Sequence, residues 1–144
     1  DRDVIQSESN YHMLCHIAKL VNEGFFYDGG RIRGIPVQIG GTSYVPPLPI
    51  ETVVIERIDE IRSQDKEPIE IAIEYCMKTQ VFKDGNKRAS VIFANHYLIA
   101  QGMGFLVIPE KDVPEFKKLL VQYYEGEPLE VIGTFLKERC WKNF

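Results

Sequence analysis

The residues best suited to chemistry lie in one short loop, VFKDGNKR at 81–88. Gly85 allows neighbouring backbone amides to converge, and Asn86 begins a largely apolar run that predicts a helix. The first N–H groups of a helix have no partner within it and carry partial positive charge, so they attract anions. Lys87 and Arg88 add two cations in the first turn, where a helix favours acidic residues. This arrangement favours the binding of phosphate.

Asp84 supplies the one carboxylate of this loop. Beside a phosphate, such a carboxylate is suited to hold Mg²⁺, which prefers oxygen ligands. The same residues also fit a plainer interpretation, in which an Asp-Gly turn opens a helix and Lys87 and Arg88 extend into solvent. Because the loop is short, both interpretations stay open on its residues alone.

The elements that must position this loop are predicted to be mostly helical. Apolar residues recur at helical spacing over 10–23, 51–63, 68–79, 112–125 and 128–141. The run 89–100 is apolar or small at nearly every position and predicts a central helix buried on all sides. Residues 37–45 form two β-like arms around Gly40-Gly41, a hairpin pattern, and 105–108 form a further extended piece. We expect an all-α fold, a helical bundle around the buried central helix with one small β-hairpin.

Composition excludes several classes of protein. The chain of 144 residues is long enough for one domain, and we expect a single domain over 1–144; its start at Asp1 is compatible with a fragment of a longer chain. A net charge of −4 argues against broad nucleic-acid binding, and no apolar run approaches the ~20 residues of a membrane span. Three dispersed cysteines indicate a reducing compartment, and we expect a cytoplasmic protein. His12 and His16 share a helical face without a third ligand, which favours packing or solvent contact over metal binding.

Three segments resemble the Fic/Doc family. Gln80-x-Phe82-x-Asp84-Gly85-Asn86-Lys87-Arg88 resembles its signature loop, H-x-F-x-[DE]-G-N-[GK]-R-x-x-R. The stretch IGGTSYVPPLP at 39–49 resembles the flap of the family, a glycine-rich hairpin followed by Pro-Pro, and YDGGRIRG at 27–34 resembles the segment before the flap. The pieces stand in the family's order, and the resemblance covers residues 11–141.

The resemblance implies a Fic fold and the transfer of AMP from ATP, or of phosphate in the Doc branch, to a hydroxyl group of a target protein. By the match, Phe82 anchors the loop in the core and Asp84 holds Mg²⁺. The nucleotide phosphates are bound by Gly85, Asn86, Lys87 and Arg88. The flap holds a segment of the target protein by strand-like pairing, through Gly40, Gly41, Thr42, Ser43 and Tyr44.

Two positions depart from the family pattern. The family histidine, which takes the proton from the attacking hydroxyl, falls on Gln80, whose amide accepts no proton usefully at pH 7. The second signature arginine falls on Val91, so one phosphate contact is missing. We therefore expect binding of ATP or another nucleotide with Mg²⁺ and weak or lost transfer activity. Two alternatives stay open: an active transferase that uses a base other than histidine, and a helical protein-interaction domain that binds no nucleotide. The sequence indicates neither the target protein nor the oligomeric state.

Overall fold

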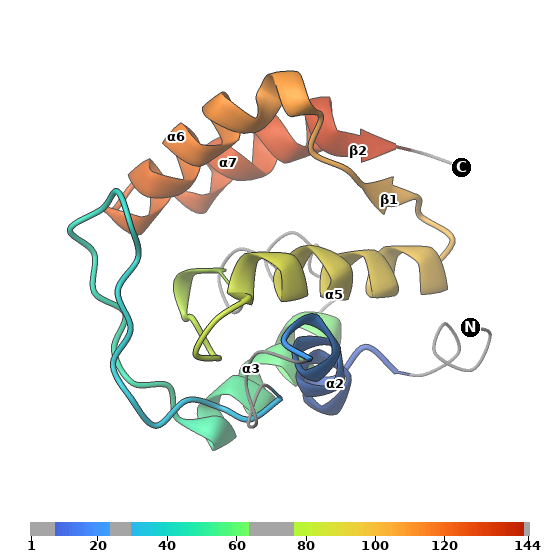
Figure 1. Cartoon of the computed structure of the whole chain (residues 1–144). Helices are drawn as coiled ribbons and strands as arrows, with labels where there is room; N and C mark the ends of the chain where they lie inside the picture. The colour runs from blue at the N-terminus through green and yellow to red at the C-terminus, as the bar shows by residue number, and fades with distance from the viewer. Residues whose placement is uncertain (1–7, 24–29, 64–76, 143–144) are drawn as a thin grey trace.

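The structure is a computed structural model that describes residues 8–23, 30–63 and 77–142. Within these residues the chain is mostly helical, as expected (Figure 1). The helices are α2 (Tyr11–Val21), α3 (Glu51–Ser63), α5 (Asn86–Ala100), α6 (Val113–Tyr124) and α7 (Leu129–Phe135). The helix expected over 68–79 lies almost wholly outside the described residues.

Short polar and proline signals set the helix ends. The Asn10 side chain accepts a hydrogen bond of 3.0 Å from the Met13 amide and so caps α2. Helix α6 follows a 3-10 turn at Glu110–Asp112 and has a proline in its first turn, where the missing N–H costs nothing. Helix α7 begins directly after Pro128. These signals place the starts of the helices close to the predicted ones.

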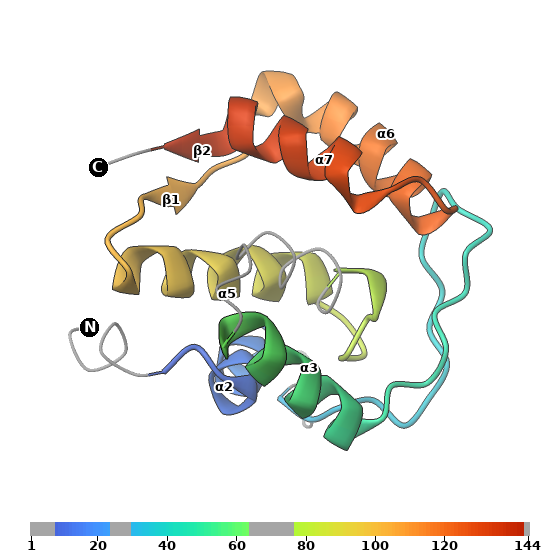
Figure 2. The same cartoon turned by 180° about the vertical axis from the view of Figure 1, so that it is seen from behind.

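Helix α5 lies between two pairs of helices, and both views show this (Figures 1 and 2). Its first half packs with α2 and α3 in one cluster of buried residues, which includes Leu14, Ile58 and Phe93. Its last turns pack with α6 and α7 in a second cluster, which includes Leu98 and Leu120. The loop before α5 therefore lies at the end of the helix that both clusters share.

The structure corrects the prediction that α5 is buried on all sides. Ile92 is 46% exposed and Ile99 is 39% exposed, although most apolar residues of the helix are buried. A continuous apolar run fits a fully buried helix, but here it also supplies apolar residues to the surface. No helix among the described residues has the length and apolar character needed to cross a membrane.

The described residues hold one small antiparallel sheet, which pairs the extended piece after α5 with the end of the described chain. Strand β1 (Phe105–Leu106) pairs with β2 (Trp141–Lys142), with Phe105 opposite Lys142 and Leu106 opposite Trp141. The helix expected over 128–141 is therefore shorter than predicted: α7 continues as a π-helical turn over Leu136–Cys140 and then gives way to β2.

The predicted hairpin over 37–45 is only partly confirmed. The chain turns at Gly40-Gly41, where Gly41 has a φ of +84°, but neither arm is a strand. Prolines at 36, 46, 47 and 49 provide no N–H groups for a ladder near the base of the arms. Side-chain contacts hold this segment in place instead. We call residues 37–45 the flap.

Candidate functional site

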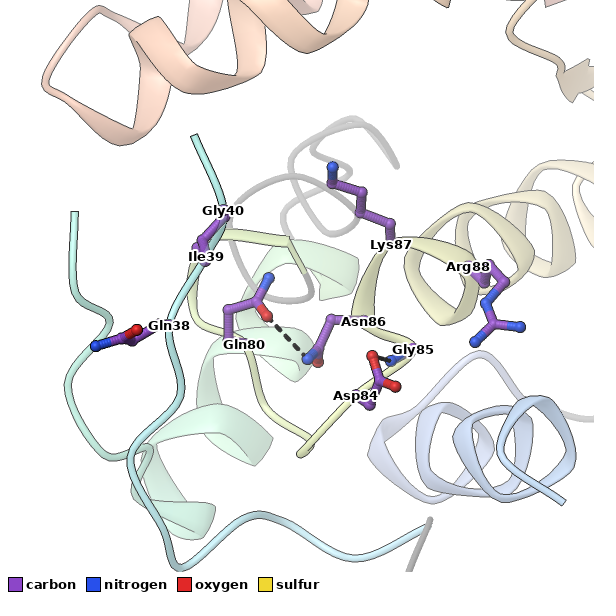
Figure 3. A pocket seen from close by; sticks show the side chains of 9 residues that line it. All are labelled: Gln38, Ile39, Gly40, Gln80, Asp84, Gly85, Asn86, Lys87 and Arg88. Carbon is purple, nitrogen blue, oxygen red and sulfur yellow. Dashed lines mark hydrogen bonds between the residues drawn. The ribbon is translucent and has the colours of Figure 1, made fainter. Parts of the chain in front are cut away.

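The loop before α5 and the first arm of the flap enclose a hollow of about 380 Å³, which we call the loop hollow (Figure 3). The residues of the signature loop that sequence analysis assigned to binding all line it, and so does Gln80. Of the five flap residues predicted to hold a target, only Gly40 lines it. Its lining consists of Gln38, Ile39, Gly40, Gln80, Asp84, Gly85, Asn86, Lys87 and Arg88.

The start of α5 leaves three backbone donors unused. The first hydrogen bond of the helix runs from the Ala89 amide to the Gly85 carbonyl, at 2.9 Å. No acceptor among the described residues meets the amides of Asn86, Lys87 and Arg88, and no side chain caps the helix. The Gly85 amide, in contrast, donates to Asp84 Oδ1 at 2.8 Å. The anion site expected from the sequence therefore has its free donors at 86–88.

Position 85 requires glycine. Its φ is +73°, and a Cβ there would lie 2.8 Å from Asn22 Oδ1, at the end of α2. Asn22 in turn donates from Nδ2 to the Asp84 carbonyl oxygen at 3.1 Å. The loop is thus held closely against α2, which fixes the direction in which α5 starts.

Phe82 and Asn86 anchor the loop from the core side. Phe82 is 1% exposed, so the expectation that its ring is buried is confirmed. The Asn86 side chain bonds to the backbone of Phe82 in both directions: Oδ1 accepts from the amide at 3.0 Å, and Nδ2 donates to the carbonyl at 2.9 Å. One buried amide group therefore satisfies the loop backbone where no regular secondary structure can do so.

Gln80 reaches the loop hollow, as expected, but its amide group is engaged at both ends. Its Oε1 accepts a hydrogen bond from Asn86 Nδ2 at 3.0 Å, shown dashed in Figure 3. Its Nε2 donates to the Met77 carbonyl at 2.5 Å. Its backbone has a φ of +53°, a value that residues other than glycine adopt only at an energetic cost. Gln80 therefore stabilises the loop, and one N–H and one lone pair of its amide stay available to orient a reacting group.

Two cations stand at the start of α5 and point in different directions. Figure 3 shows the Arg88 side chain directed toward α2, away from Gln80, and Lys87 directed away from Asp84. Neither forms an ion pair with a described residue, and Arg88 does not contact the acidic face of α3. Burial, and then the nearby charge of Lys117 on α6, lowers the pKa of the Lys87 ammonium. The loop hollow is accordingly lined by two cations without a described ion-pair partner, together with the carboxylate of Asp84.

Arg33 fastens the base of the flap to the loop, and sequence analysis did not identify it. The side chain is 4% exposed, and burial lowers the pKa of its guanidinium despite the opposing influence of Tyr44. It forms no ion pair with a described carboxylate. Its N–H groups instead donate to the backbone carbonyls of Ile35, Pro46, Pro47, Thr79 and Gln80. A single side chain thus joins the segments before and after the flap to the residue that faces the loop hollow.

The tip of the flap is held by the end of α6. Thr42 Oγ1 donates to Glu125 Oε1 at 2.9 Å, and the Tyr44 ring stacks on Tyr124 with centroids 5.8 Å apart. Between these contacts and Arg33, no described residue bonds to the backbone groups of 37–39. The first arm of the flap therefore presents unpaired N–H and C=O groups, two of its residues lining the loop hollow.

Comparison with known proteins gives a match at the level of structure. No family model matches the sequence, and no curated protein matches it significantly. A Fic domain containing signaling protein from Bacteroides thetaiotaomicron superposes with a TM-score of 0.67 at 16% identity, over 94% of this chain and 62% of that one. A fragment of Fic-1 from C. elegans superposes with a TM-score of 0.69 at 17% identity, over 95% of this chain and 42% of that one. This chain thus has the fold of Fic domains and spans less than two thirds of either protein.

Proposed function

We propose that the chain is a Fic-like domain that binds the phosphates of a nucleotide, together with Mg²⁺, at the 84–88 loop. The observation that carries the proposal is the set of three amides at the start of α5 that no described residue meets, in residues that line a hollow and include two cations without a described ion-pair partner. A helix start of this kind binds oxyanions through both its N–H groups and its dipole. The hollow of about 380 Å³ also lies within the range of small-molecule sites.

The carboxylate of Asp84 fits a magnesium ion that is shared with phosphate. One of its oxygens accepts from the Gly85 amide, and the other has no partner among the described residues. Mg²⁺ is commonly held by one or two carboxylates together with substrate phosphates, so a lone carboxylate beside an anion site suffices. When bound, the ion neutralises phosphate charge. Asp84 would hold it, while the amides of 86–88 would fix the phosphate oxygens.

We further propose that transfer of AMP is weak or lost. A transferase needs a group that accepts the proton of the attacking hydroxyl, and Gln80 occupies that place with both ends of its amide already bonded. Val91, in place of an arginine, removes one phosphate contact. On this proposal the loop keeps the groups that bind phosphate and Mg²⁺, while the position of the family's proton acceptor holds an amide.

The flap provides the surface on which we propose that a target protein docks. The unpaired backbone groups of 37–39 suit the addition of an extended peptide strand, which is recognised mainly through main-chain hydrogen bonds. Arg33 and Glu125 hold the arm at both ends, so little ordering would be needed on binding.

Nucleotide binding is tested by a thermal-shift titration with ATP and MgCl₂. A ligand at about a hundred times its Kd stabilises the folded state by about 2.7 kcal/mol, which raises Tm by several degrees for a chain of this size. Asp84→Ala should reduce the part of the shift that depends on Mg²⁺ and keep the part seen with ATP and EDTA. No shift at millimolar ATP and Mg²⁺ would contradict nucleotide binding and favour a protein-interaction domain.

The loss of the base is tested by restoring it. Gln80→His should increase incorporation of label from ATP, because imidazole titrates near the working pH and histidine tolerates a positive φ better than most residues. The gain should stay below the full ~10²–10⁴-fold of general-base catalysis. Adding Val91→Arg should increase it further, since 91 lies one helical turn after Arg88.

Gln80→Asn is the matched control for this series, because it keeps an amide and tolerates the same backbone conformation but supplies no base. Asp84→Ala in the double variant should abolish incorporation. A double variant that binds ATP and Mg²⁺ yet transfers no label would show that the missing base does not explain the loss of activity.

A further inference from the structure

A second hollow of about 420 Å³ adjoins the loop hollow, and we call it the apolar hollow. Lys87 and Arg88 line both hollows, so the two share a boundary at the first turn of α5. The other described residues of its wall have apolar side chains and come from α2, α5, α6, the segment before the loop and the segment after β1: Val21, Met77, Val91, Ile92, Ile108 and Phe116.

The wall of the apolar hollow selects against polar groups. Among the described residues that line it, every side chain apart from the two cations is aliphatic, aromatic or a thioether, and one of them, Ile92, is 46% exposed. A nucleobase placed against it would leave its polar edge without hydrogen-bond partners, which carries a large penalty. A saturated or aromatic hydrocarbon would instead remove apolar surface from water on both sides.

The boundary between the two hollows selects for negative charge. Neither Lys87 nor Arg88 has an ion-pair partner among the described residues, and Lys117 brings a third cation near Lys87 from α6. The free amides of 86–88 lie at the same turn of the helix. An anionic group at this boundary would be held from both sides while a hydrocarbon attached to it filled the apolar hollow.

We infer that the apolar hollow is a subsite for a small amphipathic anion, a molecule with an oxyanion head and a hydrocarbon body. Its head lies between Lys87, Arg88 and the start of α5, and its body lies against Val91, Ile92 and Phe116. The inference shares one premise with the proposed function, namely that the 84–88 loop binds an oxyanion. It adds a ligand class that the loop hollow alone does not distinguish.

The test is a series of monoalkyl phosphates from methyl to octyl, each measured below its micelle concentration by isothermal titration calorimetry. Affinity should rise by about two- to fourfold for each methylene that enters the apolar hollow, since each buried CH₂ contributes about 0.8 kcal/mol. Octan-1-ol, which has the chain but no oxyanion, should bind far more weakly than octyl phosphate. Equal affinity for methyl and octyl phosphate would overturn the subsite. The same result is expected if another part of the chain or a protein partner fills the hollow, and the subsite is overturned in that case too.

Two substitutions on α5 locate the effect. Val91→Phe fills the apolar hollow and should remove the dependence of affinity on chain length. Ile99→Phe adds the same ring at an exposed position on the same helix and should keep that dependence. If the dependence survives Val91→Phe, the hydrocarbon binds elsewhere and the inference fails. Binding of ATP without any chain-length effect would overturn the subsite alone, whereas failure of every phosphate, ATP included, would also overturn the anion site of the loop.

Discussion

Replacing Arg33 with alanine is expected to lower the free energy of unfolding by about 3–5 kcal/mol. The guanidinium is 4% exposed and bonds to the carbonyls of five residues in three separate stretches of chain. Each buried carbonyl left without a donor costs about 1–3 kcal/mol. Water can replace the donor at only some of these five carbonyls, so part of the cost remains. Chemical denaturation followed by circular dichroism measures the change.

Arg33→Lys is the informative control for this experiment. It keeps the positive charge but replaces a planar fork of five N–H donors with a single ammonium, which cannot reach carbonyls that lie around a plane. We expect it to recover less than half of the lost stability. Full recovery by lysine would show that charge, and not the donor geometry, holds the flap. A stability equal to that of the parent protein in Arg33→Ala would contradict the role of this residue altogether.

Phe82→Ala is expected to destabilise the chain by about 3–5 kcal/mol, because the ring is 1% exposed and its removal leaves a cavity beside α2 and α5. The same substitution should also weaken binding of ATP, since Phe82 and Asn86 together fix the start of α5. Denaturant titration gives the first effect, and thermal shift at a temperature where the variant is folded gives the second.

Phe82→Leu separates the two contributions of the ring. Leucine fills much of the same volume, so most of the stability should return, with a remaining loss of about 1–2 kcal/mol. If Phe82→Ala unfolds at the same midpoint denaturant concentration as the parent protein, the placement of the ring in the core is contradicted.

The loop could be predicted from the sequence because its evidence is local. A glycine before an apolar helix and two cations in the first turn each have a direct structural meaning, and the resemblance to the family loop implies that Phe82 is buried. The structure confirmed that Phe82 is buried and that Gln80 reaches the hollow, and the amides that no described residue meets lie at 86–88. The sequence did not indicate that Asp84 occupies the Gly85 amide, because such a short contact depends on a single side-chain rotamer.

The contacts of the flap could not be predicted, because they join distant segments through side chains. Arg33 donates to the carbonyls of Thr79 and Gln80, which lie 46 and 47 positions further along the chain. Thr42 donates to Glu125, which is 83 positions away. Every residue has a backbone carbonyl, so the sequence does not show which carbonyls accept from an arginine. A buried arginine of this kind cannot be distinguished from a surface arginine by sequence alone. The Gly40-Gly41 pattern predicts two strand-like arms, but the prolines at 36, 46, 47 and 49 lack the N–H groups that pairing of the arms would need.

The left-handed backbone at Gln80 limits which residues a single nucleotide substitution can place there without strain. Codons for glutamine and histidine share their first two bases, so a change of the third base alone converts one residue into the other. The φ of +53° at this position disfavours β-branched and bulky residues, while histidine is among those that adopt it more readily. The turn thus already has a backbone shape that histidine, a proton acceptor, can adopt after a single nucleotide substitution, while the hydrogen bonds of the Gln80 amide to Met77 and Asn86 would be exchanged for those of an imidazole.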